Sequence, residues 1–305
     1  MAGRSIKLFL VDGTPQGMRT AEVGNWTGLA LVCPRTDLAQ LAKRDGVHRT
    51  GVYILVGPSE SSASGLAVYV GEGDDVWSRL SSHDDKKDWW TWVVIFVSKD
   101  ENLTKAHVRW LEARLVDDVK KAKRAEVMNG NAPGGNRLPE PDTADMETYY
   151  ENVRLLLPTL GVNVFSADVP TTATGAPKDA LVLELHWEDA KAECLVTDGQ
   201  FIVQAGSTAR VKQVESLGDG SKALRKALRD QGVMVPVEGS STLLKFTQPY
   251  AFDSPSGAAG VVSGTGLNGR AHWKVQDETK PYKEWLSYKD WEEKLVNEAE
   301  AAEST

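Results

Sequence analysis

The sequence predicts an α+β fold, in which a small mixed sheet flanked by helices is followed by a second α+β domain. Two short runs of β-branched and aromatic residues, 51–56 and 66–71, are typical of buried strands that form a hairpin. A long pattern with helical spacing occupies 104–124. A segment rich in Thr, Pro and Gly, 169–177, separates these elements from a further set of strands and helices.

The first part of the chain, 1–48, is predicted to be a small N-terminal extension. Residues 5–11 have the composition of a strand, and 17–31 are expected to form a second strand pair or a bend. Residues 37–43 predict a short helix with its leucines turned inward. We expect this extension to add strands to the sheet of the next domain; a grip on DNA is the alternative.

Residues 49–137 are predicted to form a domain around the hairpin. Each strand of the hairpin carries one Tyr near one end, with a Gly two positions away. A helix is expected over 76–83, and Val76, Leu80 and His83 share one face of it. Arg79 lies beside this face, one turn from His83. These residue types therefore gather close to the hairpin.

A third strand is expected over 89–97, which contains three Trp residues. Because Trp89 and Trp90 are adjacent, they would face opposite sides of a strand. This favours core packing over a platform on which bases stack. The stretch 129–136, rich in Asn and Gly, ends the long helix.

The apolar face of that long helix is interrupted by an acidic residue. The apolar stripe comprises Val108, Leu111, Leu115 and Val119, and Glu112 falls inside it. A carboxylate in such a position needs a partner, because burying an unpaired charge is unfavourable, and a metal ion is one candidate.

Taken together, these residues resemble the GIY-YIG nuclease family. Gly51-Val52-Tyr53 corresponds to the first triplet, Tyr69-Val70-Gly71 to the second, Arg79 to the helix arginine and Glu112 to the metal-binding glutamate. The order and spacing match as well. The resemblance is detailed over roughly 49–135, and the flanks look like a bacterial subgroup with a C-terminal domain of unknown function.

The resemblance implies hydrolysis of a phosphodiester, which requires an aligned water, a base and charge on the developing phosphate. It also implies Mg²⁺ (or Mn²⁺) as the cofactor, bound by Glu112. Mg²⁺ suits a site with few protein ligands, because it keeps several waters. Arg79 would bind the phosphate, since its planar fork of donors matches phosphate oxygens.

The resemblance gives roles to four further side chains. Tyr53 is the candidate base, and nearby positive charge must lower its ordinary pKa of ~10. Tyr69 would position the water or the phosphate. His83 would contact the scissile phosphate or protonate the leaving oxygen. The late asparagine of the family is Asn129 or Asn131.

One departure from the family follows the second triplet. The run Glu72-Gly73-Asp74-Asp75 stands where many members place Lys, Ser or Thr. It removes a possible cation beside Tyr69, and it could instead provide a further metal carboxylate from Glu72 or Asp74.

The formal net charge of −8 argues against a non-specific nucleic-acid coat. The charge is uneven, however, and basic residues cluster at the end of the long helix. A phosphate-binding patch and a solvated helix face are the two interpretations of this cluster. The candidate nucleic-acid contacts are Arg79, Lys120, Lys121, Lys123 and Arg124.

Composition places the chain among folded globular proteins, with 41% hydrophobic residues and 10 Trp. No apolar run approaches membrane-spanning length and no signal peptide is evident, so no membrane partner is expected. Cys33 and Cys194 lie far apart without the spacing of paired ligands. A reduced cytoplasm is the expected location.

Beyond the nuclease-like domain, 138–178 is predicted to be a helix and linker. Pro139-Glu140-Pro141 is assigned to the linker, and 145–157 to an amphipathic helix that docks on either neighbouring domain. An accessory α+β domain of unknown function is expected over 179–286. An acidic terminal helix or tail, 287–305, follows it.

Inside the accessory domain, Asp198-Gly199 predicts a hairpin turn between two strands. The other expected elements are a strand over 181–187, a helix over 221–231 with a Ser N-cap, a helix over 254–262 and a strand over 270–275. No catalytic spacing is evident in this region.

The sequence therefore predicts a Mg²⁺-dependent endonuclease that hydrolyses DNA phosphodiester bonds, with the accessory domain choosing the substrate or partner. A non-catalytic DNA-binding or regulatory protein with the same fold is the main alternative, and an RNA nuclease is the third. The oligomeric state stays open.

Overall fold

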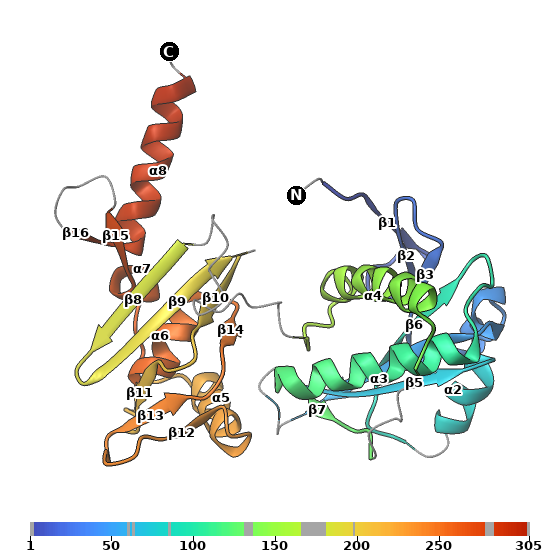
Figure 1. Cartoon of the computed structure of the whole chain (residues 1–305), viewed down its shortest axis with the longest axis horizontal. Coiled ribbons are helices and arrows are strands. Elements are labelled where there is room, and N and C mark those ends of the chain that lie inside the picture. The colour runs from blue at the N-terminus through green and yellow to red at the C-terminus, as the bar shows by residue number, and fades with distance from the viewer. Residues whose placement is uncertain are drawn as a thin grey trace. The chain divides into compact units, whose positions relative to one another are not determined.

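The computed structural model describes residues 3–59, 62, 65–84, 87–130, 137–165, 181–197, 199–277 and 284–303. The chain divides into two compact units, Met1–Phe165 and Ser166–Thr305 (Figure 1). Each unit combines sheets with helices, which confirms the predicted α+β class. The expected linker at 169–177 and the loop residues 131–136 lie outside the described residues.

The first unit is built on a seven-stranded mixed sheet with the order β1-β2-β3-β6-β4-β5-β7. The parallel pair is β5–β7, and the other neighbours are antiparallel. The strands are β1 (Ile6–Leu10), β2 (Arg19–Val23), β3 (Gly28–Pro34), β4 (Gly51–Pro58), β5 (Leu66–Gly73), β6 (Trp92–Ser98) and β7 (Glu126–Val127).

The N-terminal strands belong to this same sheet. β3 pairs with β6 along its length, from Gly28 opposite Ser98 to Pro34 opposite Trp92. The segment 1–48 thus extends the sheet of the domain predicted over 49–137, as expected from the sequence. It also contributes short helical segments, which are η1 (Arg35–Asp37), α1 (Leu38–Leu41) and η2 (Asp45–His48).

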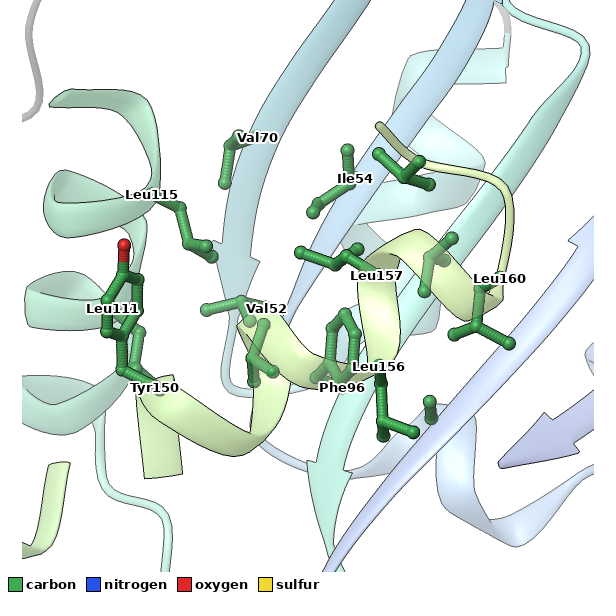
Figure 2. Packing of buried hydrophobic residues seen from close by; sticks show 14 of the residues in the cluster. Val52, Ile54, Val70, Phe96, Leu111, Leu115, Tyr150, Leu156, Leu157 and Leu160 are labelled. Carbon is green, nitrogen blue, oxygen red and sulfur yellow. The ribbon is translucent and has the colours of Figure 1, made fainter. Parts of the chain in front are cut away.

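Side chains on one face of the sheet pack beneath two long helices, α3 (Lys105–Ala122) and α4 (Glu140–Thr159). Figure 2 shows this core, with residues of the sheet facing leucines of both helices. Successive residues of a strand point to opposite faces, so Val52 and Ile54 lie in this core while Tyr53 lies in another. The second core lies against α1, η2 and α2 (Val76–Asp84).

The helix α4 begins earlier than predicted. The structure includes Glu140 and Pro141 in its first turn, so their assignment to a linker is wrong. Proline is tolerated there because its missing N–H would have had no partner within the helix. The apolar face of α4 docks on the sheet of the first unit, which decides between the two neighbours.

The third strand of the domain predicted over 49–137 begins at Trp92, three residues later than predicted. Trp89 and Trp90 precede the strand, and Trp90 is buried under the guanidinium of Arg35. They approach β4 closely, since a Cβ at Gly57 would lie 2.3 Å from the Trp89 carbonyl oxygen. Core packing is therefore confirmed for Trp90.

The second unit contains a six-stranded sheet with the order β14-β10-β9-β8-β15-β16 and a three-stranded sheet with the order β11-β13-β12. The strands are β8 (Leu181–Trp187), β9 (Ala190–Thr197), β10 (Gln200–Val203), β11 (Thr208–Arg210), β12 (Met234–Pro236), β13 (Leu243–Phe246), β14 (Tyr250–Phe252), β15 (Lys274–Asp277) and β16 (Glu284–Ser287). The helices are α5 (Asp219–Asp230), α6 (Pro255–Ser263), α7 (Gly269–His272) and α8 (Tyr288–Glu303).

Three predictions for this unit have clear outcomes. The β9–β10 hairpin is confirmed, with Gly199 at φ +73°. The N-cap of α5 is Gly218, so the predicted Ser cap at 221 is wrong. The strand predicted over 270–275 is also wrong in its first half, which forms α7, because the Asn268 side chain accepts a hydrogen bond from the Arg270 N–H and starts a helical turn.

None of the helices in the described part of the chain has both the length and the apolar character needed to cross a membrane. Both cysteines, Cys33 and Cys194, are buried and carry free thiols.

Candidate functional site

The two tyrosines of the hairpin share one face of the sheet. Tyr53 on β4 lies opposite Gly71 on β5, and Leu55 lies opposite Tyr69. Cross-strand partners project from the same face, so the two rings are neighbours, with centroids 6.3 Å apart and planes inclined by 37°. The two phenol groups are therefore held as a pair by strand register.

Glycine is required beside this pair because of close packing. A Cβ at Gly71 would lie 2.4 Å from the phenol oxygen of Tyr53. A Cβ at Gly73 would lie 2.7 Å from Cγ of Arg79. The last glycine of the second triplet thus makes room for the first tyrosine, and the next glycine makes room for the arginine.

Tyr53 has no exposed surface. Burial raises the pKa of its phenol far above the ordinary value, the neighbouring Tyr69 and two carboxylates raise it further, and Arg79 opposes the rise. A phenol that acts as a base needs nearby positive charge to lower its pKa. Here the effect of Arg79 is smaller than the combined effect of burial, Tyr69 and the two carboxylates. Tyr69 is partly exposed, so it is the tyrosine that a water or phosphate can reach.

The pKa of Tyr69 is raised by burial and by the charge of Glu112. Arg79 and the neighbouring phenol of Tyr53 lower it. Four residues predicted to form the site therefore interact with one another, although they come from four different elements.

Arg79 is placed by the helix α2. The Ser78 N–H donates to the Asp75 carboxylate over 2.9 Å in the first turn, and Val76 and Leu80 anchor the helix in the core. Arg79 lies on the exposed side of α2, where its charge acts on both tyrosines. His83 lies in the same helix, and its side chain is outside the described part of the structure.

Glu112 interrupts the buried face of α3, as predicted, and its side chain is partly buried. Burial, and then the charge of Glu72, raise the pKa of the Glu112 carboxyl to about 7, against the effect of three nearby cations. A carboxyl in this state is poised between its two forms at neutral pH. A divalent cation would favour the carboxylate by direct charge attraction.

The carboxylate of Glu72, which departs from the family pattern, is held by two cations of α3. Its oxygens lie 2.7 Å from Nζ of Lys105 and 3.8 Å from Nε of Arg109. Lys105 also lies 3.4 Å from the carboxylate of Asp74. Neither cation was predicted from the sequence. Their positions, seven and three residues before Glu112, place them on its side of the helix and could have identified them.

Asn129 supports the strand that carries Tyr69. Its amide accepts a hydrogen bond from the Val70 N–H (3.0 Å) and donates one to the Val70 carbonyl (2.8 Å). The side chain therefore pairs with β5 as a backbone would. The other candidate, Asn131, lies outside the described residues.

The predicted basic cluster is not one exposed face. Arg124 is only 6% exposed, so it does not belong to a solvated face or a phosphate-binding patch. Lys121 forms an ion pair of 2.5 Å with Asp117, and Lys123 ends α3 in the left-handed conformation. Lys120 is exposed, but it lies about 12 Å along the helix axis from Glu112.

The donor groups of the site fit a hard divalent cation. Glu112 and Glu72 are close enough to influence each other, and carboxylate oxygens are the ligands that Mg²⁺ and Mn²⁺ prefer. Within the described ranges, no group of three or more His, Cys, Asp and Glu side chains could form a metal cage. The arrangement suits an ion that keeps most of its waters.

Comparison with known protein families finds one match, which lies in the second unit. Residues 183–286 match a family described as a domain of unknown function (DUF4357). The match runs from β8 to β16, within the range predicted for the accessory domain. Comparison of the chain with curated proteins and with solved structures gave no match.

Proposed function

We propose that this protein is a metal-dependent endonuclease that hydrolyses phosphodiester bonds of DNA, with the site in its first unit. The observation that carries the proposal is the convergence of Tyr53, Tyr69, Arg79 and Glu112. Each of the last three affects the ionisation of Tyr53, although the four residues come from β4, β5, α2 and α3. A phenol pair, a guanidinium and a carboxylate match the needs of phosphodiester hydrolysis.

In the proposed site, Glu112 would hold a Mg²⁺ or Mn²⁺ ion, and Glu72 is a further carboxylate close enough to act on Glu112. When bound, the ion supplies positive charge that stabilises the developing charge on the phosphate. Arg79 binds phosphate oxygens through its fork of donors. These residues fix the phosphate beside the tyrosines.

The tyrosines divide the remaining work according to their exposure. Tyr69 is partly exposed and contacts the attacking water or a phosphate oxygen. Tyr53 is fully buried, and its neighbouring phenol lowers the pKa of the Tyr69 phenol. This differs from the assignment of Tyr53 as the group that meets the water, because a side chain without exposed surface does not reach one.

A non-catalytic DNA-binding or regulatory protein is the second candidate. The raised pKa of Tyr53 favours it, because a phenol that burial keeps protonated is a poor base. The second unit would choose the substrate or the partner in either case.

The test is incubation of the full-length protein with supercoiled plasmid, linear duplex, branched DNA and RNA, with Mg²⁺, Mn²⁺ or EDTA. We expect cleavage of DNA that EDTA abolishes. Cleavage of RNA alone would identify an RNA nuclease. Tight binding without cleavage of any substrate would replace the enzyme with the regulatory candidate.

A pair of matched variants separates chemistry from packing. Tyr53→Phe and Tyr149→Phe both remove a buried hydroxyl, and that of Tyr149 donates to the Val97 carbonyl on the other face of the sheet. Each should cost about 1 kcal/mol of stability. Only Tyr53→Phe should slow cleavage, by ~10²-fold. Equal rates for the two variants would show that Tyr53 is only a core residue.

A further inference from the structure

A lysine outside the predicted site lies against one of its tyrosines. Nζ of Lys87 lies over the ring of Tyr69, 3.2 Å from its centroid. Lys87 precedes β6, whereas Tyr69 is on β5, so the contact joins two parts of the first unit. An ammonium group over an aromatic face is attracted by the negative charge density of the ring.

The charge of Lys87 is not neutralised by an acid. Among the residues that the structure describes, no carboxylate forms an ion pair with Lys87, whereas Lys105 is shared by Glu72 and Asp74. Burial lowers the pKa of the Lys87 ammonium, because it takes hydration away from the charge. A cation in this position can stabilise negative charge that develops on the neighbouring phenol of Tyr69.

The surroundings of Tyr69 explain why such a cation is needed. The groups that act on the pKa of its phenol are Tyr53 from β4, Glu72 from β5, Arg79 from α2 and Glu112 from α3. Two of these four are carboxylates, which disfavour negative charge on the phenol oxygen, and Arg79 is the cation among them. Lys87 is a further cation, held against the ring of Tyr69.

We propose that Lys87 is a positioning residue for Tyr69, whose ammonium group holds the ring in place and stabilises negative charge on the phenol oxygen. It compensates for the acidic run that follows the second triplet. Its effect on the phenol is independent of the proposed nuclease function, and only its effect on turnover rests on that function.

The direct test follows the ionisation of position 69 alone. Tyr69 is replaced by 3-fluorotyrosine in the full-length protein, because this phenol ionises at lower pH and gives a single ¹⁹F NMR signal. The titration is compared between the otherwise unchanged protein, Lys87→Met and Lys87→Arg. Methionine keeps an unbranched chain of similar length over the ring and removes the charge, whereas arginine keeps the charge.

We expect Lys87→Met to lower the ionisation constant of the phenol about three- to tenfold, and Lys87→Arg to restore most of it. Lys99→Met is the control, since Lys99 is an exposed lysine of the same unit, paired with Glu22. It should leave the titration unchanged. The inference is overturned if the phenol at position 69 has the same ionisation constant in the Lys87→Met variant as with Lys87 present.

Cleavage kinetics give the second readout. With tyrosine at position 69, Lys87→Met should lower kcat while DNA affinity and its salt dependence stay the same. A loss of salt dependence without a change in the titration would make Lys87 a phosphate contact and overturn the positioning role. If the unchanged protein cleaves no nucleic acid, the proposed function fails, and the titration still decides this inference. Lys87→Gln serves the same comparison should the Met variant fold poorly.

Discussion

Replacing Glu112 with Gln should stabilise the metal-free protein at neutral and alkaline pH. Folding raises the pKa of the Glu112 carboxyl from 4.5 to about 7, first through burial and then through the charge of Glu72. Because one pKa unit corresponds to ~1.4 kcal/mol, the ionised side chain costs roughly 3 kcal/mol as an upper bound. Partial exposure reduces this to about 1–3 kcal/mol.

The pH dependence follows from the direction of this change. A carboxyl whose pKa rises on folding favours the folded state below its unfolded pKa, and this contribution is lost as pH rises through the folded pKa. For Glu112 the loss occurs between pH 4.5 and about 7. Gln does not ionise, so the variant should lack this part of the pH dependence and should exceed the wild type in stability at pH 8.

Hydrogen exchange of α3 amides in EDTA, measured from pH 5 to 8, reports the stability of the first unit separately from the second. Glu151→Gln is the control, because Glu151 is an exposed carboxyl of the same unit. Equal stability of wild type and Glu112→Gln at pH 8 would refute the argument from burial. Mg²⁺ should stabilise the wild type alone, and equal stabilisation of both proteins would refute the metal role.

Three further predictions test the packing, the phosphate contact and the division into units. Gly71→Ala should lower the melting temperature and abolish cleavage, because its Cβ would lie 2.4 Å from the buried phenol oxygen of Tyr53. The control is Gly130→Ala, which should do neither, because no atom lies within 4 Å of its Cβ. Arg79→Ala should reduce the salt dependence of DNA binding by about one phosphate contact, while Lys120→Ala, measured beside it, should leave cleavage intact. The fragment 1–165 should fold alone by circular dichroism and cleave with altered substrate preference; an insoluble fragment, or one as selective as the full chain, would contradict the division of roles.

Much of the site could be predicted because its signals are local. The β4–β5 hairpin and the helix α3 follow from the spacing of apolar residues in short windows. Glu112 stands out in the sequence because a carboxylate interrupts that spacing, and the structure places it where the pattern predicts. Strand register then brings the tyrosines together without further information.

One cation beside the site, Lys87, could not be found in this way. Lys87 meets Tyr69 through a contact between distant segments, and no local pattern marks it. Conversely, the adjacent basic residues at the end of α3 suggested one surface, but the chain leaves the helix at Lys123 and Arg124 is buried. Sequence proximity of charges is thus a weak guide to which of them share a face.

The errors in secondary structure came from residues with two common uses. Pro141 occurs in linkers and also in first helical turns, and packing of the rest of α4 on the sheet selected the helix. Asn268-Gly269 occurs in hairpin turns and also caps helices, and burial of Trp273 after the turn accompanies the second outcome. In both cases tertiary contacts decided between two locally acceptable structures.

The order of strands in the first sheet also bears on how the site forms during folding. β4 pairs with β5 across a short loop, whereas β3 pairs with β6 across a much longer segment, with Leu31 opposite Ile95. Loop closure loses more chain entropy as the loop lengthens, so we expect the tyrosine hairpin to form before the N-terminal strands dock. Until β3 arrives, β6 has an unpaired edge that can recruit strands from other chains. By pairing with β6 late in folding, the N-terminal segment would prevent partly folded molecules from associating through this edge.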